Sequence, residues 1–155
     1  MMWPLDADEA RSASRSFFSR EGPRDSFTVL GISAHPKDLD RLRDILSRMK
    51  WNLREARSCH EAMMVLCSYW MPIIVCDRSL PDGNWKDILS LTAPLLEPPS
   101  VIVMSEVVDD SWSAEVLDMR GYGVLAKPLD EGEVTRVLVA ACRSWQPTGV
   151  ARASG

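Results

Sequence analysis

Short apolar runs alternate with segments of helical periodicity along most of this chain. Five apolar runs have the length of strands: 27–32, 51–56, 72–77, 101–104 and 121–126. Five other segments repeat apolar residues every three or four positions: from 36, from 58, 85–91, 110–119 and 131–143. Strands that alternate with helices form parallel sheets. The sequence therefore predicts an α/β fold, a doubly wound three-layer sandwich with five parallel strands and five helices.

Local signals support several of these elements. Pro36 stands where the first helix begins, a position at which proline costs no backbone hydrogen bond. Ser58-x-x-Glu61 predicts a capping box for the second helix. The run 51–56 alternates apolar and polar residues and predicts a strand near the edge of the sheet. The run 101–104 is apolar on both faces, as a buried parallel strand is.

Length and composition allow one folded domain. The chain has 155 residues, of which 46% are hydrophobic and 26% charged. We assign a domain to 26–145 and flexible tails to 1–25 and 146–155. So few residues outside the domain predict that no output domain is attached.

Charge and cysteine content exclude several classes of function. The formal net charge of -4 comes without the clustered Lys and Arg that nucleic acid requires, so no nucleic-acid partner is expected. No apolar stretch reaches the roughly 18 residues that span a bilayer, so no membrane partner is expected. The four cysteines lack CxxC spacing, which favours reduced thiols in a cytoplasmic protein.

Three polar residues of complementary chemistry follow three successive apolar strands. Asp77, Ser105 and Lys127 stand at the carboxyl ends of the third, fourth and fifth predicted strands. Because parallel strands place these ends on one edge of a sheet, we expect the three side chains to meet there. A carboxylate can take a phosphoryl group, a hydroxyl can hydrogen-bond its oxygens, and an ammonium can offset their charge. The sequence therefore predicts a phosphate-accepting site.

The motifs around these residues resemble the receiver domain of two-component response regulators, which has a flavodoxin-like fold, over roughly 26–145. The resemblance rests on three motifs: Asp77-x-x-Leu80-Pro81-Asp82-Gly83, Ser105 after a Val/Ile strand, and Lys127-Pro128 after Gly121-Tyr122-Gly123-Val124-Leu125. It implies that Asp77 accepts phosphate from a histidine kinase or phosphotransfer protein, that Ser105 shifts toward the phosphoryl group, and that Lys127 binds it. It also implies a cis bond before Pro128.

The match to the family fails at the residues that hold a metal ion. In the family an acidic pair ends the first strand and binds Mg²⁺, but the matching positions here are Ser33 and Ala34. By resemblance, Asp77 and the backbone carbonyl of Ser79 remain as ligands. Since Mg²⁺ prefers carboxylate and water oxygens, we expect it to bind weakly and expect no tightly bound cofactor. Without the pair, Asp77 and Lys127 are expected to form a one-to-one ion pair.

Polar residues near the missing pair allow two interpretations. Asp38 and Asp40 lie in the first turn of a helix, where the helix dipole favours acidic residues without any metal. This interpretation is preferred over their being replacement metal ligands. His35 is interpreted as a solvated loop residue rather than a ligand or phosphate acceptor.

Three apolar residues bear on how a signal leaves the site. Val124 stands where family members usually carry an aromatic residue that couples to the hydroxyl residue, which weakens the case for that coupling. Trp85 and Trp112 border the predicted pocket and are candidates for partner contact; the alternative is that they are single exposed apolar residues without a partner, which are normal on protein surfaces. By resemblance, a downstream protein target binds the face of the fourth helix, fifth strand and fifth helix. A homodimer is left open.

Two hypotheses of function remain. In the first, the chain is a stand-alone response regulator in phosphorelay signalling, switched by phosphorylation of Asp77 despite a weakened Mg²⁺ site. In the second, it is a pseudo-receiver that acts as a binding scaffold without phosphorylation, which Ser33, Ala34 and Val124 favour. An enzyme is not predicted, because the site has no general base beside a nucleophile beyond this set.

Overall fold

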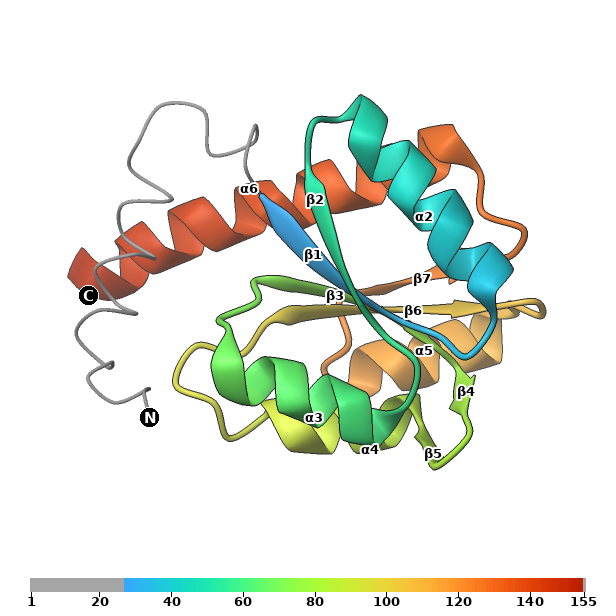
Figure 1. Cartoon of the computed structure of the whole chain (residues 1–155). Helices are drawn as coiled ribbons and strands as arrows, with labels where there is room; N and C mark the ends of the chain where they lie inside the picture. The colour runs from blue at the N-terminus through green and yellow to red at the C-terminus, as the bar shows by residue number, and fades with distance from the viewer. Residues whose placement is uncertain (1–26, 155) are drawn as a thin grey trace.

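The main sheet of the protein is parallel and has five strands. The computed structural model describes residues 27–154, with side chains as far as residue 144, so the tail predicted at 1–25 lies outside the described residues. The strands are β1 (Thr28–Ile32), β2 (Asn52–Ala56), β3 (Ile73–Asp77), β6 (Ser100–Ser105) and β7 (Gly123–Ala126). Their order across the sheet is β2-β1-β3-β6-β7 (Figure 1), that of a flavodoxin-like doubly wound fold. The predicted fold class is confirmed.

Helices cover both faces of this sheet. The described residues form α2 (Pro36–Arg48), α3 (Cys59–Ser68), α4 (Trp85–Thr92), α5 (Asp110–Asp118) and α6 (Glu131–Ser154). Helices α2 and α6 lie on one face, and α3, α4 and α5 lie on the other (Figure 1). Leu42 of α2 and Leu138 of α6 are buried in the core on the first face of the sheet. Ile88 of α4 and Val116 of α5 are buried in the core on the second face. The sheet is therefore apolar on both sides, as a doubly covered parallel sheet must be.

Strand register brings the predicted site residues to one edge of the sheet. Asp77 ends β3 and is paired with Met104 of β6, one residue before Ser105. Ser105 is paired with Ala126 of β7, and Lys127 follows directly. Three strands in a row therefore end beside one another, each with a polar residue at its end.

Helix α3 begins at the predicted cap. The hydroxyl of Ser58 accepts a hydrogen bond from the backbone N–H of Glu61 at 3.1 Å, which confirms Ser58 as the N-cap. The carboxylate of Glu61 accepts from the backbone N–H of Arg57 at 2.9 Å. The reciprocal half of the capping box is thus displaced by one residue, and it still satisfies a backbone donor at the start of the helix.

A small antiparallel hairpin follows β3 and was not predicted. It consists of β4 (Ser79–Leu80) and β5 (Gly83–Asn84), which pair with each other. Strands of two residues are too short to carry a periodic pattern, so the sequence signals only a turn at Pro81. The hairpin separates the end of β3 from the start of α4.

The last helix is longer than predicted. Helix α6 runs to Ser154, so the helix end predicted at Arg143 and the absence of structure predicted for 146–154 are wrong. Pro147 suggested a stop, because proline removes a backbone donor and opposes a helix interior. Beyond it, Ala151-Arg152-Ala153 consists of strong helix formers, which favour continuation of the helix.

Candidate functional site

Asp77 and Lys127 meet at the edge of the sheet, as predicted. Asp77 is 4% exposed at the end of β3, and its Oδ1 accepts a hydrogen bond from Lys127 Nζ at 3.1 Å. Lys127 comes from the loop after β7, and its side chain is also mostly buried. A carboxylate and an ammonium in such a sheltered position attract each other more strongly than they would in water.

Lys127 is shared by two carboxylates rather than one. Its Nζ also donates to Asp38 Oδ2 at 2.9 Å, from the first turn of α2. The predicted one-to-one ion pair is therefore wrong. Asp38 lies in the first turn of α2, as predicted, and its contact with Lys127 was not expected. Burial by itself lowers the pKa of Lys127, but the hydrogen bonds to Asp38 and Asp77 outweigh it and raise the pKa above its ordinary value.

Ser33 occupies one position of the missing acidic pair and joins the same network. It is fully buried, and its Oγ lies 3.0 Å from Asp38 Oδ2 and 3.4 Å from Asp77 Oδ2. A hydroxyl has one proton, so Ser33 donates to one carboxylate at a time, and the shorter distance favours Asp38. Ser33 also accepts from the backbone N–H of His35 at 3.0 Å. The hydroxyl therefore bridges two carboxylates where the family has an acidic residue.

His35 lies at the open side of the pocket. Its Nε2 is 3.7 Å from Asp77 Oδ2, and two thirds of its side chain (67%) is exposed. The predicted solvent exposure is confirmed, while the contact with Asp77 is additional. Ala34, at the other position of the missing pair, brings only a methyl group. Asp77 therefore faces the imidazole of His35 on its open side, and a hydroxyl and a methyl group stand at the acidic-pair positions.

The remaining predicted residues, Ser105, Pro128 and Ser79, lie at or just after the ends of β6, β7 and β3. Ser105 is 6% exposed, and its Oγ accepts from the backbone N–H of Val107 at 3.2 Å. The peptide bond between Lys127 and Pro128 is cis, as predicted. Ser79 is exposed in β4, two residues after Asp77. The Ser105 hydroxyl thus forms this hydrogen bond within its own loop.

These residues fit a Mg²⁺ ion poorly. The two carboxylates present, from Asp38 and Asp77, both already accept hydrogen bonds from Lys127. Within the part of the chain that the structure describes, no three His, Cys, Asp or Glu side chains are grouped as metal ligands. A hard cation that needs several oxygen ligands would have to compete with an ammonium group for the same oxygens.

Trp85 and Trp112 belong to the core, so the prediction that they are exposed contact residues is wrong. They are 3% and 4% exposed, and their rings meet edge to face with centroids 6.3 Å apart. Large rings bury much apolar area, and here they fill the contact between α4 and α5. Arg78, the residue after Asp77, places its guanidinium 4.4 Å from the centroid of the Trp112 ring. The tryptophan pair therefore contacts the residue that directly follows Asp77, the candidate phosphate acceptor.

A cavity of about 520 Å³ opens beside Lys127. Residues of α2, of the loop after β6 and of the loop after β7 line it: Lys37, Asp38, Arg41, Glu106, Lys127, Pro128 and Leu129. Two of these residues, Asp38 and Lys127, belong to the network around Asp77. Small reagents can therefore approach the network from this side.

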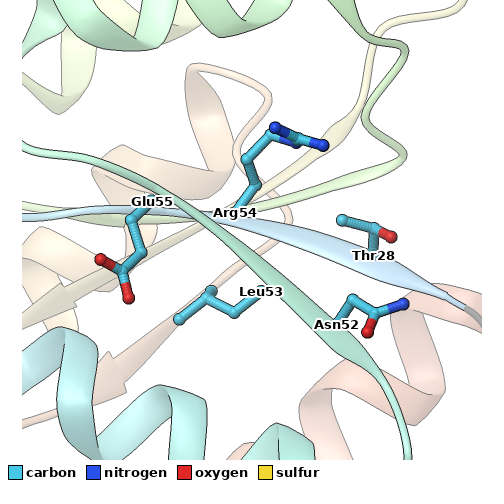
Figure 2. Close-up of a pocket in the computed structure, with 5 residues that line it drawn as sticks. All are labelled: Thr28, Asn52, Leu53, Arg54 and Glu55. Atoms are coloured by element: carbon cyan, nitrogen blue, oxygen red, sulfur yellow. The ribbon is translucent and has the colours of Figure 1, made fainter.

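A second hollow lies along the edge strand β2 (Figure 2). Its side chains do not converge, because Arg54 and Glu55 point to opposite sides of the strand. Arg54 stacks over the ring of Tyr69, and Glu55 pairs with Arg43. These side chains already have partners, so this hollow is a weaker candidate for a site than the carboxyl edge of the sheet.

Sequence reasoning underestimated Asp38. A usable signal was the position of Pro36, which starts α2 directly after the carboxyl end of β1. Residues in the first turn of such a helix lie near the edge where the site forms. The spacing could not show that the side chain turns toward Lys127, because these residues are 89 positions apart in the chain.

Comparison with known families tests the resemblance directly. A family model for the response regulator receiver domain matches residues 29–139, more than half of the chain. The chain belongs to this family. Receivers are modules of two-component signalling, and they generally relay signals rather than turn over substrates. The predicted family is therefore confirmed.

Individual relatives agree with this assignment. The receiver is 24% identical over 119 residues to response regulator protein PilR of Pseudomonas aeruginosa; the match covers 77% of the chain but only 27% of PilR. A two-component response regulator from Clostridium difficile has a TM-score of 0.68 at 20% identity, covering 76% of this chain and 96% of that one. A chain of the CheX-CheY-BeF3-Mg²⁺ complex from Borrelia burgdorferi has the same TM-score and identity, covering 74% and 87%. These structures support the fold.

The helices of the receiver, over its described residues, do not have the character of membrane spans. Of those that the structure describes, none is both long enough and apolar enough to cross a bilayer.

Proposed function

We propose that this receiver accepts a phosphoryl group on Asp77 from a histidine kinase or phosphotransfer protein. The observation that carries the proposal is the contact between Asp77 Oδ1 and Lys127 Nζ at 3.1 Å, with Ser105 at the end of the next strand. A carboxylate oxygen of Asp77 forms the new P–O bond while the P–N bond of the phosphohistidine breaks, and the histidine ring leaves as neutral imidazole, keeping the proton already on its other ring nitrogen. Lys127 offsets the charge on the phosphoryl oxygens.

We further propose that Mg²⁺ binds this receiver weakly. Ser33 and Ala34 contribute no carboxylate, and Lys127 holds the carboxylates of Asp38 and Asp77. When bound, a divalent cation would supply charge neutralisation and alignment of the phosphoryl group. With weak binding, phosphorylation of Asp77 should be slow and should need excess Mg²⁺.

Fluorescence of the buried tryptophans and intact mass together test the phosphate acceptor. Mg²⁺ and then beryllium fluoride are titrated into the wild type and into Asp77→Asn, which keeps the shape of the side chain. We expect a saturable change only in the wild type, because Trp112 contacts Arg78, the neighbour of Asp77. A small acyl phosphate should add one phosphoryl group to the wild type alone. Equal responses of the two proteins would refute the proposal.

The second candidate is a scaffold that works without phosphorylation. The closed network favours it, because Asp77 and Asp38 already share Lys127 and so neutralise the pocket. In that case neither protein gains mass or changes fluorescence, and Asp77→Asn binds the protein's targets as tightly as the wild type. A phosphoryl group gained by the wild type and not by Asp77→Asn would exclude the scaffold.

We also propose a protein target for the face formed by α5, β7 and α6. The CheX-CheY-BeF3-Mg²⁺ complex from Borrelia burgdorferi shows that a protein of this fold associates with a partner protein. Leu117 and Met119, at the end of α5, are 56% and 40% exposed and offer apolar area for such a contact. A homodimer through the same face is the alternative, and sedimentation with and without beryllium fluoride distinguishes the two.

A further inference from the structure

Lys127 lies closer to Asp38 than to Asp77 in the pocket. The distance from Lys127 Nζ is 2.9 Å to Asp38 Oδ2 and 3.1 Å to Asp77 Oδ1. Both aspartates are largely sheltered, with 16% and 6% of their side chains exposed. We propose that Asp38 is a positioning residue that anchors Lys127 and opposes the arrival of a phosphoryl group on Asp77.

The backbone and a neighbouring hydroxyl hold Asp38 in place. Its N–H donates to the carbonyl oxygen of His35 at 3.0 Å, which fixes the first turn of α2 at the edge of the sheet. Its Oδ2 accepts from Ser33 Oγ at 3.0 Å as well as from Lys127. One carboxylate oxygen with two donors is well fixed in direction. A helix residue thus supplies a carboxylate that the end of β1 lacks.

The anchoring limits what Lys127 can do. An ammonium group has three N–H donors, and two of them are directed to Asp38 and Asp77. A phosphoryl group on Asp77 needs Lys127 and is repelled by the charge of Asp38. Removing that charge should therefore free Lys127 and strengthen the binding of phosphoryl analogues. This second consequence rests on the proposed phosphorylation of Asp77, whereas the anchoring does not.

Chemical reactivity of Lys127 tests the anchoring by itself. Acetic anhydride modifies only the neutral amine, so the pH profile of Lys127 acetylation, measured by peptide mass spectrometry, reports its pKa. Asp38→Asn should lower the midpoint pH of Lys127 acetylation. At a fixed alkaline pH it should raise the acetylation rate by roughly three- to tenfold, the size expected for loss of a partly sheltered charge pair. Asp40→Asn is the matched control, because Asp40 lies in the same helix turn and pairs with exposed Arg43.

Ser33→Ala provides a second variant in case Asp38→Asn folds poorly. It removes a donor to Asp38 and leaves all charges in place, so a smaller increase in the acetylation rate is expected. If Asp38→Asn and Ser33→Ala both match Asp40→Asn, Asp38 does not position Lys127 and the inference is overturned.

Beryllium fluoride binding tests whether Asp38 opposes a phosphoryl group on Asp77. With Mg²⁺ in excess, Asp38→Asn should bind the analogue roughly three- to tenfold more tightly than the wild type, and Asp40→Asn should bind like the wild type. Weaker binding by Asp38→Asn would identify Asp38 as a metal ligand and overturn this part. Absence of binding in every variant would instead reject the proposed phosphorylation, and the acetylation profile would still decide the anchoring.

Discussion

Asp82 belongs to the family motif after Asp77, yet its contacts are to helix α3. Its carboxylate accepts hydrogen bonds from the backbone N–H groups of Cys59 and His60, at 2.8 and 3.0 Å. These two bonds hold the pKa of Asp82 below its ordinary value. Asp82 therefore caps α3 from outside the helix, and this residue of the motif stabilises the fold.

The depressed pKa makes this cap dependent on pH. The contribution of Asp82 to stability is complete above its unfolded pKa of about 4 and is lost as pH falls through its lower folded pKa. Asp82→Asn should therefore lower the urea midpoint at neutral pH, and its difference from the wild type should shrink toward about pH 3. Asp118→Asn, at the exposed end of α5, is the control. A difference independent of pH would contradict the assignment.

Helix α4 is short and depends on its first turn. It has eight residues, and both halves of a capping box are present. The Asn84 side chain accepts from the backbone N–H of Lys86 at 2.8 Å, and Asp87 Oδ2 accepts from the N–H of Asn84 at 2.9 Å. This start places Trp85 in the core. The element therefore connects the hairpin after Asp77 to the tryptophan pair.

Removal of the cap should weaken α4. Asn84→Ala leaves a backbone donor at the helix start without its partner and should cost about 1 kcal/mol of unfolding free energy, within the ~0.5–2 kcal/mol range of such caps. Urea denaturation measures the loss. Asn52→Ala, on the exposed edge strand β2, is the matched control and should change stability little. Equal effects of the two substitutions would show that the capping box contributes nothing.

At the scale of the whole described domain, the five-stranded sheet carries an apolar core on each face. The central strand β3 is fully buried along its length and pairs with β1 and β6. The edge strand β2 is more exposed and carries charged residues, which discourage pairing with another sheet. Stability should therefore be concentrated at the centre of the sheet, directly beneath the pocket.

Equivalent truncations in the two strands should differ in cost. Ile74→Ala in β3 should lower the free energy of unfolding by about 2–5 kcal/mol, because it leaves a cavity in a fully buried site. Leu53→Ala in β2 should cost less, since Leu53 is partly exposed and its surroundings can relax. Urea denaturation measures both. A larger loss for Leu53→Ala would contradict the view that the core is centred on β3.

Most of the fold could be predicted from periodicity, and the errors have identifiable causes. The main strands and the helix starts at Pro36 and Ser58 follow from local pattern, because burial imposes a period on each element. The hairpin after β3 was missed because it is too short to show a period. The extent of α6 was missed because Pro147 is an ambiguous signal for a helix end.

The candidate site was partly predictable. Asp77, Ser105 and Lys127 could be found because each follows an apolar run, and parallel strands bring such ends together. The sharing of Lys127 with Asp38 could not be found, because it depends on the direction of side chains that lie far apart in the chain. The burial of Trp112 likewise depends on how α4 and α5 pack.

The sequence by itself determined the order of strands and helices, the family motifs and the absence of an acidic pair at Ser33 and Ala34. Each of these is local, since it depends on residue type and spacing. Only the tertiary structure decided which charges face one another. A charge interaction depends on distance and shelter from water, and both are established when β3, β7 and α2 pack together. For this reason Asp77 could be identified from the sequence as a candidate phosphate acceptor. The closed network that Asp38, Lys127 and Ser33 form around it could not be predicted.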